Sequence, residues 1–222
     1  IYFGGAAMNN VADVIMNQTS SAGLWFGISC AYAGNVNGDQ YDDVIIGGSM
    51  TTGVGFGAAF IYYGGQSMDN IEDVSMAGYA YGLDDHFGYS VSYAGDVNGD
   101  TYSDIVVGAY GHDIAGTDAG AAYVFFGGAN MNGTADVYLL GASSGDYFGV
   151  SVANAGNMNN DTHDDVIIGA CYNDAGGSNT GRAYVFYGGN SMDNRRDLVL
   201  TGNTPNGNFG WSVANAGDLN SD

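Results

Sequence analysis

The sequence predicts an all-β fold built from propeller blades. Three observations lead to this prediction: a long internal repeat, four short strand-like runs in each repeat, and a composition rich in Gly and aromatic residues. The chain has 222 residues, of which 39 are Gly, 17 are Tyr and 10 are Phe. The dipeptide Phe-Gly recurs at intervals of 61 residues, beginning at Phe26, Phe87, Phe148 and Phe209. An internal period of this length is typical of arrays of repeated structural units.

Each repeat contains four short apolar runs bounded by Gly or by Asp and Asn. In the second repeat the runs lie at Tyr89–Ala94, Asp104–Ala109, Ala121–Phe126 and Asp136–Leu140. They are rich in Val, Ile, Tyr and Phe and too short for helices. Four strands per repeat predict a propeller blade, whose sheet is apolar on both faces because it packs between two neighbours. A β-solenoid is the alternative fold, but 61 residues would make a bulky coil.

The repeats also divide the chain into segments. Residues 1–25 match the end of one repeat, residues 26–86, 87–147 and 148–208 are complete repeats, and residues 209–222 match the start of another. The chain therefore holds about 3.6 repeats. We expect it to form a partial propeller within a longer protein.

Acidic residues dominate the charge of the chain. The formal net charge is −21, from 24 Asp and Glu residues against 3 Arg and no Lys. So few cations cannot neutralise phosphates, which excludes nucleic acid and anionic membrane surfaces as partners. No run of about 18 apolar residues is present, so we expect no membrane insertion. Glu72 is the only Glu, and a preference for the shorter Asp indicates turns, caps and metal loops.

A nine-residue loop rich in Asp and Asn follows the first strand of every repeat. The complete copies are Asn35–Asp43, Asp96–Asp104 and Asn157–Asp165, and a fourth copy begins at Asp218. Asp or Asn occupies loop positions 1, 3, 5 and 9, and position 4 of the complete copies is Gly or Asn, which tolerates a positive φ. Calcium takes about six to eight oxygen ligands, and alternate side chains on a tight turn can converge on one point. The loops therefore predict Ca²⁺ sites, about one ion per loop.

The predicted ligands are the residues at loop positions 1, 3, 5 and 9, with the backbone carbonyl of position 7. They are Asn35, Asn37, Asp39, Tyr41 and Asp43 in the first loop; Asp96, Asn98, Asp100, Tyr102 and Asp104 in the second; Asn157, Asn159, Asp161, His163 and Asp165 in the third; and Asp218, Asn220 and Asp222 in the fourth. The second loop offers three carboxylates and the first and third offer two each. Because ligand charge tightens calcium binding, we expect the second loop to be the strongest site.

Ordinary hairpin turns are the alternative interpretation, because Asn-Gly and Asp-rich clusters are common turn chemistry. A turn alone has no need for an acid at position 9, however, and the pattern repeats in every copy. An EF-hand is excluded because position 12, which would have to be Glu, is Ile46, Val107 or Ile168 inside a predicted strand. Magnesium is less suited than calcium because it retains its waters.

The order of these motifs resembles the FG-GAP repeat. In the second repeat it reads FGYSVSYAGDVNGDTYSDIVVGA, followed by AAYVFFGG, and the match covers essentially the whole chain. The family is known from the β-propeller of integrin α subunits and from bacterial and archaeal surface proteins. The resemblance implies a seven-bladed propeller with calcium loops on one face and partner-binding loops on the other, and it implies the metal ligands named above. Two departures are the missing Pro of the Gly-Ala-Pro motif and the Asn that begins the first and third loops.

These features together predict a binding module. Weak, oxygen-rich calcium loops suit millimolar extracellular calcium, so we expect a secreted or surface-exposed propeller in which calcium is structural. Its expected role is adhesion, recognition or surface assembly, with a protein, a glycan or other copies of the chain as partners. We expect no catalytic activity, because the three His residues share no zinc spacing and no nucleophile elbow is present. The alternative is an accessory module of a secreted enzyme that degrades polysaccharides or lipids.

Other recurring residues have structural interpretations. The Phe-Gly pairs are expected to pack between blades. An Asp that opens the fourth strand of each repeat is expected to cap a turn, in the series Asp13, Asp73, Asp136 and Asp197. Cys30 and Cys171 lie in apolar runs, so we expect both to be buried. Asn17, Asn132 and Asn160 begin glycosylation sequons, which are short enough to occur by chance.

Overall fold

A computed structural model of the chain describes residues 1–4, 9–17, 23–50, 55–78 and 84–217. It contains three antiparallel sheets of four strands, each with its strands in chain order. The first consists of β1 (Leu24–Gly34), β2 (Asp43–Met50), β3 (Ala58–Tyr62) and β4 (Val74–Ala77). The second consists of β5 (Phe87–Gly95), β6 (Asp104–Ala109), β7 (Ala121–Phe125) and β8 (Val137–Leu140). The third consists of β9 (Phe148–Gly156), β10 (Asp165–Ala170), β11 (Arg182–Phe186) and β12 (Leu198–Thr201).

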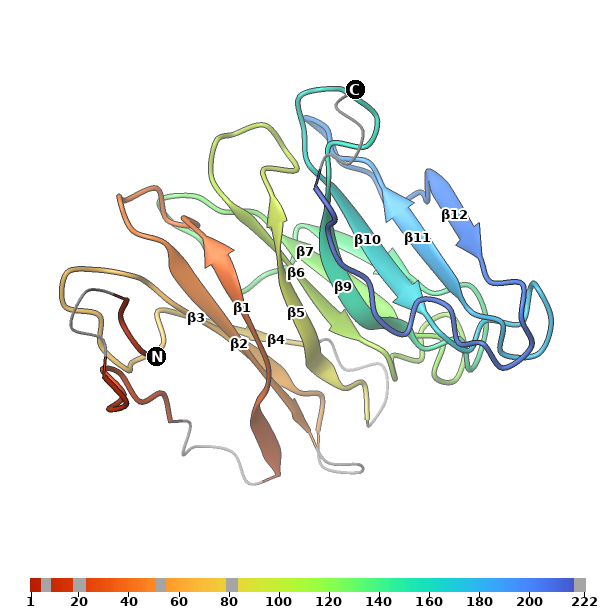
Figure 1. Cartoon of the computed structure of the whole chain (residues 1–222), viewed down its shortest axis with the longest axis horizontal. Coiled ribbons are helices and arrows are strands. Elements are labelled where there is room, and N and C mark those ends of the chain that lie inside the picture. The colour runs from red at the N-terminus through yellow and green to blue at the C-terminus, as the bar shows by residue number, and fades with distance from the viewer. Residues whose placement is uncertain (5–8, 18–22, 51–54, 79–83, 218–222) are drawn as a thin grey trace.

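The sheets lie side by side as consecutive blades (Figure 1). The first strands β1, β5 and β9 contact one another from sheet to sheet. The fourth strand of the second sheet alternates between buried and exposed residues, as expected for the outer edge of a blade. The described residues include no helix long and apolar enough to span a membrane. The prediction of an all-β partial propeller with four-stranded blades is therefore confirmed.

The hydrophobic core lies between the blades. One cluster joins the first and second sheets through residues such as Ile45, Ile61 and Phe87. A second joins the second and third sheets and includes Leu139 and Ile168. Every residue of β6 is buried, because both faces of its sheet are covered. This is the packing that the continuous apolar runs predict.

The Phe-Gly pairs that begin at Phe87, Phe148 and Phe209 each contact the blade before them. The Phe87 amide donates to the Phe56 carbonyl over 2.8 Å, and the Gly88 carbonyl accepts from the Ser29 hydroxyl over 2.8 Å. Gly88 has a φ of +80°, and a Cβ there would lie 2.1 Å from the Ala58 carbonyl oxygen, so only Gly fits. The same hydroxyl-to-carbonyl bond joins Ser90 to Gly149 and Ser151 to Gly210. The prediction that these pairs pack between blades is confirmed for the last three of the four pairs.

Two details differ from the prediction. The first strand of the second blade begins at Phe87 rather than Tyr89, because Phe87 pairs with Ala109 before a bulge shifts the register. Cys171 is buried, which raises the pKa of its thiol to about 11, but the prediction that Cys30 is buried is wrong. Cys30 lines an open pocket of about 590 Å³ between β1 and the described part of the N-terminal segment, which contributes Ile1, Val14 and Met16.

The Asp that precedes the fourth strand caps a turn in every repeat, as predicted. Its carboxylate accepts a hydrogen bond from the amide of the residue ten positions earlier, over 2.7–2.8 Å. The pairs are Phe3 with Asp13, Tyr63 with Asp73, Phe126 with Asp136, and Tyr187 with Asp197. The hydrogen bond to the backbone amide thus explains the acid at this position.

Candidate metal-binding loops

The three complete Asp/Asn loops join the first and second strands of their sheets. The first strand of every blade runs toward the same edge of the structure, so the three loops lie together at that edge (Figure 1). Position 4 adopts a left-handed backbone in each, with φ of +77° at Gly38, +78° at Gly99 and +59° at Asn160. The sequence prediction of a sharp turn at this position is confirmed. Asp218, Asn220 and Asp222 of the fourth loop lie outside the described residues.

In the second loop, hydrogen bonds link the side chains at positions 1, 3 and 5. The Asp100 amide lies 3.0 Å from Oδ1 of Asp96 and 3.0 Å from Oδ1 of Asn98, so these two oxygens converge on one nitrogen. Oδ2 of Asp100 accepts from the Asn98 side-chain amide over 2.9 Å. Its Oδ1 accepts from the Tyr102 backbone amide over 2.9 Å. These bonds therefore hold three oxygen-bearing side chains within one turn.

The third loop has the same arrangement. The Asp161 amide lies 2.9 Å from Oδ1 of Asn157 and 3.1 Å from Oδ1 of Asn159. The backbone amide of His163 donates to Asp161 over 2.6 Å, and this bond is the main reason why the pKa of Asp161 is lowered. The His163 ring also lies 3.4 Å from the same carboxylate.

The first loop differs slightly in its closing bonds. Oδ1 of Asn35 accepts from Gly38, and Oδ1 of Asn37 accepts from Asp39. The Asn35 side-chain amide donates to the Asp39 carbonyl over 2.7 Å, and Asn157 makes the same bond in the third loop over 2.6 Å. An Asp cannot donate this bond, so among the three complete loops the second is the one whose first side chain presents only oxygen.

The position 9 acids have a structural role that the sequence did not reveal. Asp104 is fully buried, and its two oxygens accept from the Val97 and Gly127 amides, each over 2.8 Å. Asp43 and Asp165 make the equivalent pairs of bonds in their blades. Desolvation raises the pKa of Asp104 to about 7, against the opposing effect of these two hydrogen bonds. Burial raises the pKa of Asp43 and Asp165 in the same way.

The donor set at positions 1, 3 and 5 fits a hard cation. All of its metal-facing candidates are carboxylate or amide oxygens, which calcium prefers. Among the described residues, no group of three or more His, Cys, Asp or Glu side chains is arranged to hold a metal ion. Asn supplies part of each loop, and in the second loop Asp104 is turned toward two backbone amides. Binding through position 9 and the number of ions thus stay predictions.

Position 8 was not among the predicted site residues, yet it contacts the preceding loop. The Ser103 hydroxyl accepts from the Asn35 amide over 3.0 Å, and the Asp164 carboxylate accepts from the Asp96 amide over 3.0 Å. The only signal in the sequence is that position 8 is polar in all three complete loops. Spacing alone could not reveal these contacts, because their partners are 68 residues apart.

The opposite edge of the blades carries a row of aromatic rings. Tyr110 lies 5.1 Å from Tyr147, Tyr147 lies 5.0 Å from Tyr172, and Tyr172 lies 6.3 Å from Trp211, measured between ring centroids. His86 stacks on Tyr110 at 4.5 Å. Burial is the main reason why the pKa of Tyr110 is raised to about 12. Three loops differ in sequence from repeat to repeat, at residues 79–86, 111–120 and 173–181, and we call them the varied loops. Gly111–Gly120 and Asn173–Gly181 leave the sheets at this same edge, and residues 79–83 of the other loop lie outside the described residues.

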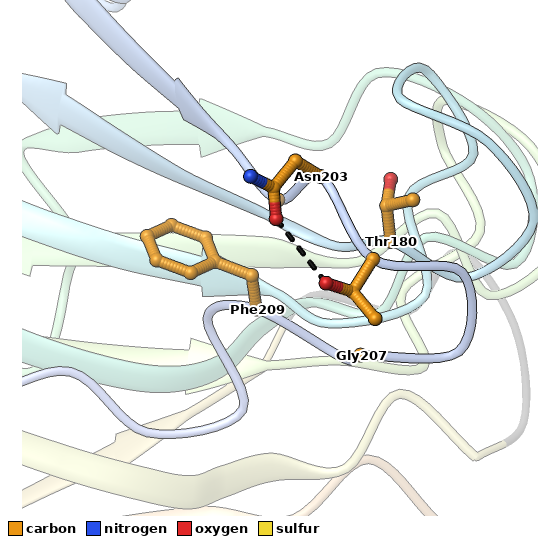
Figure 2. Close-up of a pocket in the computed structure, with 6 residues that line it drawn as sticks. Thr180, Asn203, Gly207 and Phe209 are labelled. Carbon is orange, nitrogen blue, oxygen red and sulfur yellow. Dashed lines mark hydrogen bonds between the residues drawn. The ribbon is translucent and has the colours of Figure 1, made fainter.

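An open pocket of about 290 Å³ lies where Phe209 meets the third sheet. Figure 2 shows Thr180, Asn203 and Phe209 around it, with the Thr204 hydroxyl donating to Asn203 over 3.2 Å. Phe209 is 44% exposed, whereas its equivalent Phe148 is 1% exposed against the second sheet. The pocket is therefore a contact region between blades with one side uncovered, and its lining holds no charged group.

Comparison with known proteins agrees with this architecture. Two family models, both described as FG-GAP repeat, match residues 87–125 and 140–186. Integrin alpha-6 of Homo sapiens is 33% identical over 140 residues, which is 62% of this chain and 12% of the relative. Integrin alpha-5 of Xenopus laevis is 35% identical over 152 residues, or 63% of this chain and 13% of the relative. Integrin alpha-PS5 of Drosophila melanogaster is 35% identical over 107 residues, or 48% and 10%.

The chain thus spans only a small part of these relatives, between 10% and 13% of their length. The matched segments contain β5–β7 of the second blade and β9–β11 of the third. The repeat period, the blades and the family models agree: the chain contains FG-GAP repeats, and these are similar to the repeats of integrin α subunits.

Proposed function

We propose that this chain is a calcium-stabilised recognition module that acts outside the cell. The observation that carries the calcium part is that the oxygens of Asp96 and Asn98, positions 1 and 3, converge on the backbone amide of Asp100 at position 5. The protein itself supplies little positive charge to balance these acids, since it has 3 Arg and no Lys. A soluble divalent cation is the natural counter-ion, and calcium suits an all-oxygen site.

Calcium in this proposal stabilises the blades rather than taking part in a reaction. Each loop connects two paired strands, so a cation that holds the loop favours the folded blade. A ligand that binds only the folded state adds about 2.7 kcal/mol at roughly 100 times its Kd. The test is a thermal melt of the full chain in CaCl₂, in MgCl₂ and in EDTA. We expect the highest melting temperature in CaCl₂ and the lowest in EDTA, and equal melting temperatures in all three would contradict the proposal.

The second loop is proposed to be the strongest site, with Asp96, Asp100 and Asp104 as its acids. Asp96→Asn gives it the side chain that the first and third loops already carry, and should weaken calcium binding about three- to tenfold. The reciprocal Asn35→Asp should tighten the first loop by a similar factor. Calorimetric titration of both variants measures the change. A greater loss of affinity from Asn35→Ala than from Asp96→Ala would contradict the ranking.

Recognition is proposed to use the edge opposite the loops. Tyr110, Tyr147, Tyr172 and Trp211 form a continuous row there, next to the varied loops Gly111–Gly120 and Asn173–Gly181. Amphipathic rings are enriched at protein interfaces, and loops on a rigid scaffold are common binding elements. We propose a protein partner; a glycan or another copy of the chain would be the alternative outcome of the same screen.

The screen uses protein and glycan arrays with the chain in CaCl₂. Retained binding by Val199→Ser, an exposed residue on the outer strand β12, together with loss by Tyr110→Ser and Tyr172→Ser, is the expected result. Equal binding by all variants would contradict the proposal that this aromatic edge is the recognition surface. The proposed role is binding rather than catalysis, and the extracellular setting follows from the calcium concentration that such loops need.

A further inference from the structure

We propose that position 8 of the second and third loops positions the first ligand of the loop before it, and that Asp164 in this way strengthens the calcium site of the second loop. The inference rests on the calcium binding proposed above and goes beyond it, because Asp164 is not one of the predicted ligands. It assigns the second site a carboxylate that comes from the next blade.

The geometry is a reciprocal pair of hydrogen bonds. The Asp96 amide donates to Oδ2 of Asp164 over 3.0 Å, and the Asp164 amide donates to the Asp96 carbonyl over 3.0 Å. One blade earlier, the Asn35 amide donates to the Ser103 hydroxyl over 3.0 Å, and the Ser103 amide donates to the Asn35 carbonyl over 3.1 Å. The backbone of the first ligand is thus held from both sides by a residue of the following loop.

Two further contacts hold the same part of each loop. The carbonyl of position 2 accepts from a Gly of the next blade, with Gly128 donating to Val36 and Gly189 to Val97, each over 2.7 Å. The side chain at position 7 of the next loop lies against the Gly at position 4. A Cβ on Gly38 would lie 2.3 Å from Tyr102, and a Cβ on Gly99 would lie 2.8 Å from the His163 ring. Each of the first two loops is therefore completed by its neighbour.

The third loop gives an internal comparison. Among the described residues, no loop follows it to supply these contacts. Its position 2 side chain, Met158, is 49% exposed, whereas Val36 and Val97 are fully buried. Its first ligand Asn157 is exposed, whereas Asn35 and Asp96 are partly buried. Packing of the next blade against a loop thus buries the ligand positions as well as the residues at the contact between two sheets.

The two reciprocal pairs differ in charge. Ser103 is neutral and holds the neutral Asn35, whereas Asp164 brings a carboxylate to the backbone of Asp96, itself an acid. A negative charge near a divalent cation in a partly solvated loop strengthens binding by about three- to tenfold. The second loop would then owe part of its affinity to a residue 68 positions away in the chain.

The experiment follows calcium titration of the full chain by NMR, with CaCl₂ as the only added ligand. The backbone amides of Gly38, Gly99 and Asn160 report separately on the first, second and third loops, because each is position 4 of its own loop. Asp164→Ser gives the second pair the side chain that already works in the first. We expect the calcium concentration at the midpoint of the Gly99 amide titration to rise about three- to tenfold, while the midpoint for the Gly38 amide stays unchanged.

Ser103→Asp is the reciprocal variant and should lower the Gly38 midpoint by a similar factor. Partial unfolding cannot increase calcium affinity. A gain of affinity in this variant would therefore show a specific effect of the position 8 side chain rather than a loss of structure. Asp42→Ser makes the same substitution at position 8 of the first loop, where Asp42 accepts from its own blade's Tyr32 hydroxyl over 3.2 Å. This control removes one negative charge and should leave the Gly99 midpoint as in the wild type.

The outcomes separate the inference from the proposed function. If Gly38 and Gly99 do not respond to calcium in the wild type, the proposed function fails and the inference fails with it. If they respond but Asp164→Ser and Ser103→Asp leave their midpoints unchanged, only the inference is overturned. A shift in Asp164→Ser that is confined to Asn160, in the variant's own loop, also overturns it.

Discussion

Ser90 donates its hydroxyl hydrogen to the carbonyl oxygen of Gly149 over 2.8 Å, although the two residues are 59 positions apart in the chain. The bond crosses from the second blade to the third, and Gly149 is buried. Ser90→Ala would leave that carbonyl without this donor, so we expect the free energy of unfolding to fall by about 1 kcal/mol. Urea denaturation measures the change.

Ser92→Ala is the matched control. Its hydroxyl donates to the Tyr93 carbonyl over 2.9 Å within one strand and crosses no seam. We expect a loss of less than about 0.5 kcal/mol. Equal decreases in the free energy of unfolding for the two variants would show that the hydrogen bond between the blades contributes no more to stability than a hydrogen bond within one strand.

Gly108→Ala tests how closely two blades approach. A Cβ at this position would lie 2.0 Å from the Gly149 carbonyl oxygen and 2.3 Å from the Ser90 hydroxyl, and the first of these is backbone that cannot rotate away. We expect a loss of about 3 kcal/mol or more, from overpacking at the seam. Gly189→Ala is the control, because a Cβ there meets nothing within 4 Å. A melting temperature unchanged by Gly108→Ala would contradict the close approach.

Asp104→Ala separates the structural role of position 9 from any metal role. Without the carboxylate, the Val97 and Gly127 amides lose their acceptor in a buried site, which costs about 2 kcal/mol or more. The measurement is made in EDTA, so that calcium cannot contribute. Asp100→Ala changes an exposed acid of the same loop and should cost less than half as much. A small loss at Asp104 in EDTA would mean that the acid serves the cation alone.

His86 gives the fold a pH dependence. Its ring lies 3.0 Å from the Ser49 hydroxyl and stacks on Tyr110. Burial lowers its pKa below the ordinary 6.5, against the opposing effect of Asp84 and Asp118. Between 6.5 and the lowered value the unfolded chain therefore binds more protons, and stability falls as the pH falls through this window.

His86→Gln removes that titration. The melting temperature of the wild type, measured from pH 7.5 to 5 at fixed calcium, should fall more steeply than that of the variant. His112 also has a pKa lowered by burial, and it remains in both proteins, so the difference between the two curves reports on His86. Parallel curves would be inconsistent with a lowered pKa at this position.

Much of the fold could be predicted from the sequence, because a repeat of 61 residues specifies the same local structure several times. The strand β6 begins and ends where the apolar run Asp104–Ala109 does. The turn at Gly99 follows from its place in the loop and from the φ that Gly allows. Local rules of this kind need only neighbouring residues, which a sequence displays directly.

Contacts between blades could not be predicted in the same way. Asp104 was interpreted as a ligand since a turn has no need of an acid there, but the two amides that it accepts from are set by the fold, one of them 23 residues away. Cys30 lies in an apolar run yet is exposed, because its surroundings depend on how the preceding segment packs. The pairing of Asp96 with Asp164 depends on the angle between sheets, which no local pattern encodes.

The Phe-Gly pairs that open the second, third and fourth repeats pack on the blade formed by the repeat before them. A sequence repeat therefore contains one blade and part of the surface that covers the preceding blade. A repeat inserted by gene duplication would carry its own Phe-Gly pair, which packs on the preceding blade. It would also carry the Gly of its second strand, against which the Phe-Gly pair of the following repeat packs. Unequal recombination at any repeat boundary would then preserve every seam. An array joined in this way can change its number of repeats without redesign of an interface, and substitutions in the varied loops can accumulate in one copy independently of the others.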